Sequence, residues 1–261
     1  MMTRNVLLFF RSVRIIIDGH TFWKWSFTMK KLITAGVFLA ASWTVLPTVY
    51  ARTFAKGVKK RGPGREEIAL TFDDGPHPAY TPLLLDLLKQ YNVKATFFVL
   101  GEKAKLYPDL IRRMEVEGHE IGIHHHEHRS NWTLTPAALQ KQLERSAQSV
   151  QSITGNSVVY YRPPWGHFNP FTLRAARGFD TVMWTSIPGD WKEKMTAEKL
   201  ACKLRLARSN GAVITLHDSG ETAGAFEEAP LVMIEALRLF LSDQASSHFL
   251  FVTVSTLFKT T

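Results

Sequence analysis

The sequence predicts a single α/β catalytic domain, built as a distorted barrel of about seven parallel strands, and three observations support this prediction. Short apolar runs rich in β-branched residues alternate with stretches of helical periodicity from Glu66 to the C-terminus. No low-complexity linker or internal repeat divides this region. Polar clusters follow the apolar runs one after another, and in parallel barrels the loops after the strands are where the chemistry lies.

The order of the elements follows from local signals. Thr135 is a good helix cap before Pro136, and Gly118 and Gly155 end their helices. The predicted strands are Ile68–Phe72, Ala95–Leu100, Glu120–Ile123, Val158–Tyr161, Thr181–Thr185, Ala212–Leu216 and Phe249–Val254. The predicted helices lie near Thr81–Tyr91, Lys103–Glu117, Pro136–Ile153, Pro170–Arg177, Thr196–Arg208 and Glu228–Leu241.

Residues 29–51 have the order of a secretory signal. Two lysines follow Met29, an apolar run extends from Leu32 to Leu46, and Val49 and Ala51 fit a cleavage site for small residues. The apolar run is shorter than the roughly 20 residues that span a bilayer comfortably, so a cleaved signal is favoured over an anchor. We expect a secreted or cell-surface protein, membrane-tethered if the segment stays uncleaved.

Residues 1–28 scatter charged side chains through apolar stretches and extend that signal poorly, which suggests that translation starts at Met29. The formal charge of the whole chain is +9, with 32 basic and 23 acidic residues. Six of the basic residues precede residue 52, and six more lie in 52–65, a basic linker, which leaves 20 basic against 22 acidic residues in 66–261. Nucleic-acid binding is therefore not expected, although the linker could contact an anionic cell wall or membrane surface.

Two polar clusters predict a metal site. Asp73 and Asp74 stand side by side where the first strand ends, and adjacent carboxylates are costly unless a cation or a donor holds them. An Asx turn before Gly75 explains one aspartate but not both. His124 and His128 are four residues apart, a spacing that puts two imidazoles on one side of a helical turn.

Together with Asp74, His124 and His128 would supply two nitrogen ligands and one oxygen ligand. Positions for water and substrate then stay open, as in catalytic zinc sites. The neighbouring His125 and His126 leave the choice of ligands open from spacing alone. The alternative is a surface tract that binds metals only adventitiously. The single cysteine of the chain excludes a zinc site built from cysteines.

Three further clusters complete the pattern. Arg162 at a proline-rich turn suits an anchor for a carboxylate, and Trp165 could stack on a sugar face, although an ordinary ion pair would also explain the arginine. Asp190 with Trp191, and His217 after an apolar strand, supply an acid–base pair at the barrel mouth. A buried core histidine is the competing interpretation of His217.

From about Glu66 to the C-terminus, the sequence resembles the NodB-like polysaccharide deacetylases of carbohydrate esterase family four. The chain has the family's five motifs in order: TFDDGP at 71–76, the histidine pair after GHEIG, RPPWG at 162–166, the segment ending at Asp190 and Trp191, and the strand ending at His217. The resemblance implies a distorted barrel of parallel strands. It also implies a 66–261 catalytic domain that removes N-acetyl groups from a polysaccharide.

The resemblance also assigns roles. Asp73 is the expected general base, held by Arg162, and Asp190 orients the acid–base groups. The expected ligands of a divalent metal, commonly zinc, with cobalt, nickel or manganese as alternatives, are Asp74, His124 and His128. The Trp165 backbone N–H is expected to support the oxyanion, and Trp191 to lie at the substrate. His217 is expected to protonate the departing amine.

Three positions depart from the family's pattern: Ile187, Thr215 and His125. None of them removes a metal ligand or the base, so the departures bear on substrate fit and metal preference. The sequence thus predicts a metal-dependent deacetylase of an extracellular or cell-wall glycan, such as peptidoglycan or a chitin-like oligomer. A non-catalytic glycan-binding relic and an O-acetyl esterase acting on xylan are the alternatives.

Overall fold

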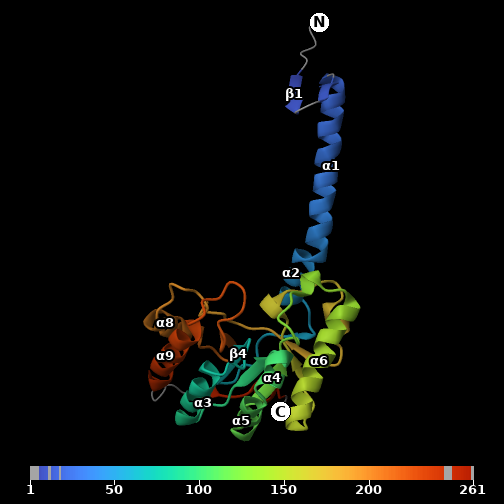
Figure 1. The fold of residues 1–261 in the computed structure, drawn as a ribbon. Helices are drawn as coiled ribbons and strands as arrows, with labels where there is room; N and C mark the ends of the chain where they lie inside the picture. Colours follow the sequence, from blue (N-terminus) through green and yellow to red (C-terminus); the bar gives the residue numbers. More distant parts are fainter. Residues whose placement is uncertain (1–5, 11–12, 18, 244–248, 260–261) are drawn as a thin grey trace.

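The structure, a computed structural model, describes residues 6–10, 13–17, 19–243 and 249–259. It confirms the predicted class, because parallel strands form a curled sheet with helices around it (Figure 1). Strand β4 (Glu67–Asp73) pairs with β9 (Ala212–His217) on one side and with β5 and β10 on the other. A bridge between Ser186 and Ile214 joins the segment after β8 back to β9, so the sheet curls into a distorted barrel.

The sheet continues from β5 in the order β6, β7, β8 and β3. The remaining strands of the body are β3 (Val58–Lys59), β5 (Thr96–Val99), β6 (Glu120–Ile123), β7 (Tyr160–Tyr161), β8 (Asp180–Val182) and β10 (Leu250–Phe251). The helices are α3 (Tyr80–Gln90), α4 (Gly101–Leu106), α5 (Pro108–Val116), α6 (Pro136–Thr154), α7 (Thr172–Ala175), α8 (Ala197–Ala207), α9 (Ala229–Ser242) and α10 (Val254–Phe258), with 3-10 turns at Asn131–Thr133 and Pro164–Gly166.

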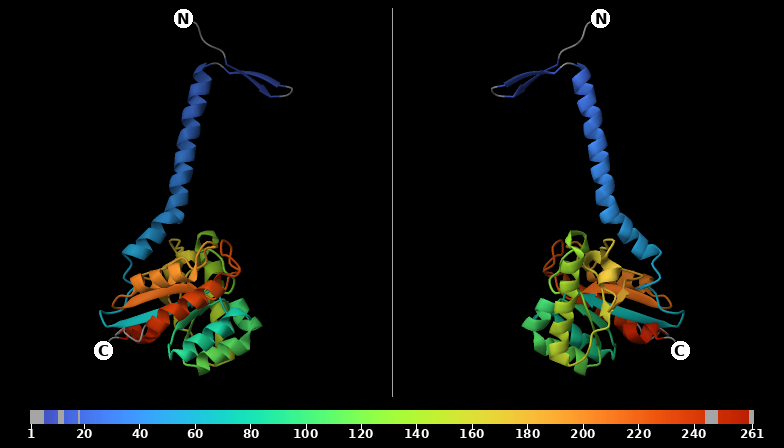
Figure 2. Two further views of the ribbon diagram at one scale, coloured as in Figure 1. Left: turned by 90° about the vertical axis from the view of Figure 1, so that its left-hand side faces the viewer. Right: turned by 90° about the vertical axis from the view of Figure 1, so that its right-hand side faces the viewer.

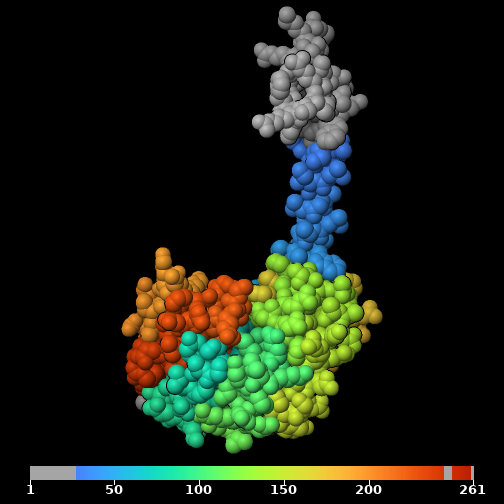
Figure 3. All heavy atoms as spheres, in the orientation of Figure 1, coloured from blue at the N-terminus to red at the C-terminus, as the bar shows by residue number. Residues whose placement is uncertain are grey.

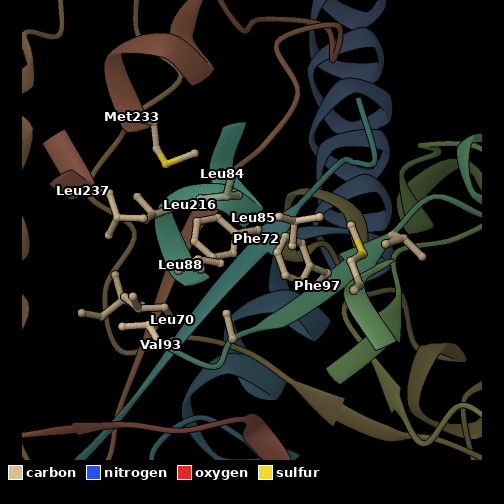
Figure 4. Close-up of a cluster of buried hydrophobic side chains, with 14 of the residues drawn as sticks. Leu70, Phe72, Leu84, Leu85, Leu88, Val93, Phe97, Leu216, Met233 and Leu237 are labelled. Carbon is tan, nitrogen blue, oxygen red and sulfur yellow. The ribbon is translucent and has the colours of Figure 1, made fainter. Parts of the chain in front are cut away.

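Successive residues of β4 point to opposite faces of the sheet, and this alternation positions the site. Ala69, Thr71 and Asp73 share the face that lines the barrel interior, with Asp73 at its carboxyl end. Leu70 and Phe72 point outward and pack under the helices with Leu84, Leu85, Leu88, Met233 and Leu237 (Figure 4). The apolar face of β4 therefore anchors the strand, and the interior face presents a carboxylate at the barrel mouth.

Several predicted elements differ in extent from the structure. The helix expected over Lys103–Glu117 is two helices, because Pro108 disfavours helical geometry at the residue before it. The helix expected over Pro170–Arg177 is only the short α7. The strand expected over Phe249–Val254 ends at Phe251, and α10 begins where Thr253 caps the backbone N–H of Thr256. The caps predicted for α6 are confirmed, since Thr135 accepts from Ala138 N–H and Gly155 is left-handed.

The segment 52–65 is not a free linker. β3 lies within it and pairs in parallel with β8, and Gly62 donates a backbone hydrogen bond to Gly211. Of the expected extension 1–28, residues 1–5, 11, 12 and 18 lie outside the described residues. β1 (Val6–Phe10) and β2 (Val13–Ile17) form an antiparallel pair in the part that is described.

Two helices connect this pair to the body. α1 (Gly19–Trp43) stands away from the body, and α2 (Val45–Thr53) lies against it (Figure 2). Among the described residues, Thr28–Thr53 is long and apolar enough to cross a membrane. Its most apolar stretch of 18 residues has a mean hydropathy of 1.7, and 6% of that stretch is buried. Figure 3 shows most of α1 after residue 27 clear of the body, whereas Trp43, its last residue, donates a hydrogen bond from Nε1 to the carbonyl oxygen of Trp132.

Candidate metal centre and catalytic site

The polar clusters predicted after separate strands meet at one end of the barrel. The register of β4 and β9 places Asp73 directly beside His217. A cleft of about 350 Å³ opens there. Of the predicted site residues, only Arg162 and Asp190 do not line it, and each of these two contacts a residue that does. The residues in the wall of the cleft are Asp73, Asp74, His124, His128, Trp165, Trp191 and His217.

Asp74, His124 and His128 form a group that could hold a metal ion. Their candidate ligand atoms all lie within 4.8 Å of one another. The Nε2 atoms of His124 and His128 lie 3.4 and 3.2 Å from Oδ1 of Asp74. That oxygen is buried and accepts no hydrogen bond from the described residues. A buried acceptor facing two imidazole nitrogens fits a divalent cation, with ligand positions left for water and substrate.

The chain reaches this arrangement through backbone geometry that the sequence reading did not anticipate. His124 and His128 lie on a loop after β6 and not on a helical turn, so that expectation was wrong. His125 has φ of 71°, a left-handed conformation, and the loop bends at the following two residues. Asp74 is also left-handed, with φ of 78°, directly after β4. These two reversals bring the three ligand atoms together.

Neighbouring groups hold the ligands in the form that a metal needs. His124 Nδ1 lies 2.7 Å from the carbonyl oxygen of Arg162, which can only accept, so the proton is on Nδ1 and Nε2 is free. Burial lowers the pKa of His124 to about 3, despite the opposing charge of Asp74. Burial alone would raise the pKa of Asp74, but contact with His128 and the charges of His217 and His124 outweigh it and hold the pKa far below its ordinary value.

The other two histidines of the tract turn away from the cleft. His125 is fully buried, and its Nε2 lies 2.9 Å from the Tyr161 hydroxyl, with the two rings stacked. The backbone N–H of His126 donates to the side-chain oxygen of Gln142 at 3.0 Å. The ambiguity that spacing alone left open is therefore resolved by position, because only His124 and His128 face Asp74.

Arg162 holds Asp73 inside the barrel. Its Nη1 donates to Oδ1 of Asp73 and to Oγ1 of Thr71, both at 2.7 Å, and its guanidinium lies over the Phe98 ring. Arg162 is 0% exposed, and its remaining nitrogens donate to the carbonyls of residues 182 and 183. Burial raises the pKa of Asp73, although Arg162 opposes that rise. Asp73 is thus fixed in position, with a carboxylate more basic than an exposed one.

His217 and Asp190 form the opposite side of the cleft. The Asp190 carboxylate accepts the backbone N–H of His217 at 2.7 Å and lies 3.2 Å from its Nδ1. Burial alone would lower the pKa of His217, but the charge and hydrogen bond of Asp190, with Asp74 and Asp73, raise it to about 10. The ring edge of Trp191 packs against the imidazole at 5.2 Å. His217 is therefore a protonated donor facing the same cleft as Asp73.

The sequence comparisons agree with this geometry. The profile of the family described as "Polysaccharide deacetylase" matches residues 60–184. A peptidoglycan-N-acetylglucosamine deacetylase of Bacillus cereus is 32% identical over 226 residues, which cover 84% of this chain and 77% of that protein. The chain belongs to the polysaccharide deacetylase family. Members of this kind are hydrolases acting on carbon–nitrogen bonds other than peptide bonds, and so is this chain.

Solved structures extend the likeness beyond the matched profile. The structure of the Bc1960 peptidoglycan N-acetylglucosamine deacetylase superposes with a TM-score of 0.71 at 30% identity, covering 78% of this deacetylase and 94% of that chain. A family 4 acetyl xylan esterase from Clostridium thermocellum, in complex with a cobalt ion, superposes with a TM-score of 0.66 at 31% identity, covering 73% and 89%. The fold of the deacetylase is therefore shared well past residue 184, where Asp190 and His217 lie.

Aromatic and apolar side chains shape the cleft of the deacetylase. Trp165 is 41% exposed and has φ of 53°, and its indole packs edge-on against the ring of His128 at 4.1 Å. Ile187 is the position that departs from the family's fourth motif. It lines the cleft, as do Trp184 and Trp191, between which it lies in the sequence. An apolar residue therefore borders the space for substrate where the family usually has a carboxylate, while Asp190 remains in contact with His217.

Sequence reasoning missed some residues that touch the site of the deacetylase. Thr222 Oγ1 donates to Oδ2 of Asp74 at 2.6 Å, which leaves Oδ1 directed at the histidines. Arg52 lines the cleft from α2. Single threonines and arginines have no local signature, and these two come from segments far from the motifs in sequence. Only the proximity of the 218–226 loop to His217 could have drawn attention to Thr222.

Proposed function

We propose that this deacetylase is metal-dependent and removes N-acetyl groups from a cell-wall or extracellular glycan, with peptidoglycan or a chitin-like oligomer as the substrate class. The similarity to peptidoglycan deacetylases supports the substrate class. The observation that supports the chemistry best is the meeting of Asp74, His124 and His128 with an acid–base pair around a single cleft. An acetamide bound there would contact a metal, a base and an acid at once.

Asp74, His124 and His128 would hold the metal, and zinc suits this set of two imidazoles and one carboxylate, as cobalt, nickel or manganese also could. When bound, the cation supplies a Lewis acid that polarises the acetamide carbonyl and acidifies a water molecule. The Thr222 hydroxyl orients the Asp74 carboxylate, and the Arg162 carbonyl orients His124.

Asp73 takes a proton from the attacking water. Its pKa is raised by burial, in the direction that makes a carboxylate a better base near neutral pH. Arg162 keeps the Asp73 carboxylate from turning away, because its own side chain is fully buried and has several partners. The position of the base is therefore set before substrate binds.

His217 gives a proton to the departing sugar amine, which cannot leave readily as an anion. Asp190 keeps the imidazole protonated and fixes its orientation through Nδ1. The Trp165 backbone N–H donates to the oxyanion, and Trp191 and Trp165 form apolar walls for a sugar ring. Asp73 with its water and the Trp165 N–H then act on the acetamide carbonyl, and His217 acts on the nitrogen that leaves it.

The domain and location assignments belong to the same proposal. Residues 66–261 are the catalytic domain, residues 1–28 are a start extension, and 29–51 direct export. Large apolar side chains of α1, such as Leu32, Val37 and Phe38, are more than 60% exposed, which is costly in water and favourable in a bilayer. We place the deacetylase on the outer face of a membrane, tethered by the apolar segment that follows Met29. N-terminal sequencing of the native protein tests both the start codon and retention of the helix.

Acetate release tests the activity. The full chain, purified in detergent and loaded with zinc, is incubated with peptidoglycan, chitin oligomers, poly-N-acetylglucosamine and acetylxylan. We expect acetate from an N-acetylated glycan, and loss of that activity in Asp73→Asn with metal content and glycan affinity retained. Acetate from acetylxylan alone would support the esterase, which the similarity to the xylan esterase structure keeps as second candidate. Glycan binding without acetate from any substrate would support the relic.

A further inference from the structure

The helix that precedes the catalytic domain is built into the body of the protein. Thr48 of α2 is 7% exposed, and its Oγ1 accepts from Trp132 Nε1 and from the backbone N–H of Phe168, both at 3.0 Å. Ala51 and Ala55 are also buried, against Phe168 and its neighbours. A hydroxyl with several buried partners belongs to a folded interface, so α2 is a structural part of the deacetylase.

α2 also brings a cation to the substrate cleft. Arg52 is the residue directly after the expected cleavage site, and it lines the cleft together with Trp184 and Trp165. Its guanidinium carbon lies 4.8 Å from the centroid of the Trp184 ring. A Cβ added to Gly166 would lie 2.7 Å from an Arg52 terminal nitrogen, so the guanidinium also packs against the turn that follows Trp165.

The guanidinium of Arg52 is held in place but is not neutralised. No carboxylate of the described residues lies within ion-pair distance of it, and none of their side chains accepts a hydrogen bond from it. A guanidinium whose face rests on an indole keeps its edge N–H groups available in a planar fork. That fork matches the two oxygens of a carboxylate. The position therefore suits an anionic group on the substrate.

We propose that Arg52 is a specificity-determining residue that binds a carboxylate carried by the glycan beside the N-acetyl group that is removed. This inference rests on the proposed function and narrows its substrate class. Chitin-like oligomers are neutral, whereas a muramic acid residue of peptidoglycan carries a free lactyl carboxylate once its stem peptide has been removed. Arg52 thus favours peptide-free strands of peptidoglycan over chitin-like oligomers. It also requires that α2 stay attached, because cleavage after Ala51 would leave Arg52 without its helix.

Paired substrates test the proposal. We compare the full chain in detergent with Arg52→Gln and Arg52→Lys on a chitin tetramer and on a tetrasaccharide alternating N-acetylglucosamine and N-acetylmuramic acid. Arg52→Gln should lower kcat/KM about tenfold on the carboxylated oligomer, mainly through KM, and by less than twofold on the chitin tetramer. Arg52→Lys should recover part of the loss, because an ammonium keeps the charge without the fork. Adding salt should lower the preference of the parent chain for the carboxylated tetrasaccharide over the chitin tetramer, and should leave the ratio for Arg52→Gln unchanged.

Lys56→Gln is the matched control, since it removes the same charge from an exposed residue four positions further on that does not line the cleft. It should behave as the parent protein on both substrates. Equal losses on both substrates in Arg52→Gln would show that Arg52 only supports the loop. Unchanged kinetics on the carboxylated oligomer would show that it does not touch the substrate. Either result overturns the proposal.

Binding alone provides a readout that does not depend on activity. Isothermal titration of the carboxylated tetrasaccharide, and of the same compound with its carboxylates reduced to alcohols, is carried out on the parent chain and on Arg52→Gln. Reduction should weaken binding to the parent about tenfold and leave binding to the variant unchanged. An equal effect of reduction on both proteins refutes the role of Arg52, even where the chain releases no acetate. A tetrasaccharide bearing stem peptides shows whether a peptide carboxylate binds instead, which would also overturn the proposal.

Discussion

Replacing Asp190 by asparagine should convert His217 from a protonated to a neutral imidazole at neutral pH. Asp190 lies 3.2 Å from Nδ1 of His217. At that distance and an effective dielectric constant of about 20, the attraction of the two charges is about 5 kcal/mol. At about 1.4 kcal/mol for each pKa unit, this equals almost four units. Since the pKa of His217 stands at about 10, removing the charge should return it to about 6.5 or below.

The hydrogen bonds favour the same direction. The backbone N–H of His217 needs an acceptor, which the asparagine carbonyl oxygen would supply in place of Asp190 Oδ2. The amide NH₂ of the new side chain then faces Nδ1, which must accept and so lose its proton. A general acid acts only while protonated, so the alkaline limb of the kcat/KM profile should move to lower pH by two units or more. At pH 8, about one imidazole in thirty would remain protonated at a pKa of 6.5.

The assay is acetate release from a chitin oligomer between pH 5 and 10, with metal content measured on the same samples. Asp180→Asn is the matched control, because Asp180 is partly exposed and pairs with Lys59. It should leave the alkaline limb in place. An alkaline limb that does not move in Asp190→Asn, with the variant folded and metal bound, would refute the assignment of His217 as an acid controlled by Asp190.

Three further predictions concern the support of the site. Thr222→Val should weaken zinc binding about tenfold, because Asp74 loses its orienting hydrogen bond. Competition with a chromophoric chelator measures the affinity for zinc, and an unchanged affinity would contradict this role of Thr222. Arg162→Gln should lower the free energy of unfolding by about 3–5 kcal/mol, since it leaves Asp73 buried without its partner; urea unfolding that shows less than 1 kcal/mol would oppose it. Thr48→Val should cost about 1–3 kcal/mol in the same measurement, because the buried N–H of Phe168 and the partly buried Nε1 of Trp132 lose their acceptor. An unchanged free energy of unfolding would mean that α2 is not docked.

The fold class and the strand ends were predictable because they depend on local patterns. Alternation of apolar runs and helical periods is visible in the sequence, and the order of the polar clusters after the strands predicts that they converge. Asp73 and His217 could be placed near each other on this basis, and their strands are indeed in register. The ends of short strands such as β7 and β10 were less predictable, because tertiary pairing decides where they stop.

The geometry of the metal group was not predictable from spacing. A separation of four residues favours a helical turn, yet His124 and His128 converge because His125 adopts a left-handed backbone within a loop. The partners of the ligands come from distant segments. Thr222 lies 148 residues from Asp74 in the sequence, and no local pattern marks such a contact. The docking of α2 was missed for another reason, since its apolar composition is equally typical of a segment that is removed.

The attachment of α2 sets a limit on where the deacetylase can work. Arg52 at the edge of the cleft is nine residues after Trp43, the last residue of α1, which is a rise of about 14 Å along a helix. With α1 in a bilayer, the mouth of the barrel faces the lipid surface at close range, and the loops of the site gather at that end (Figure 2). Only glycan lying next to the membrane is then within reach.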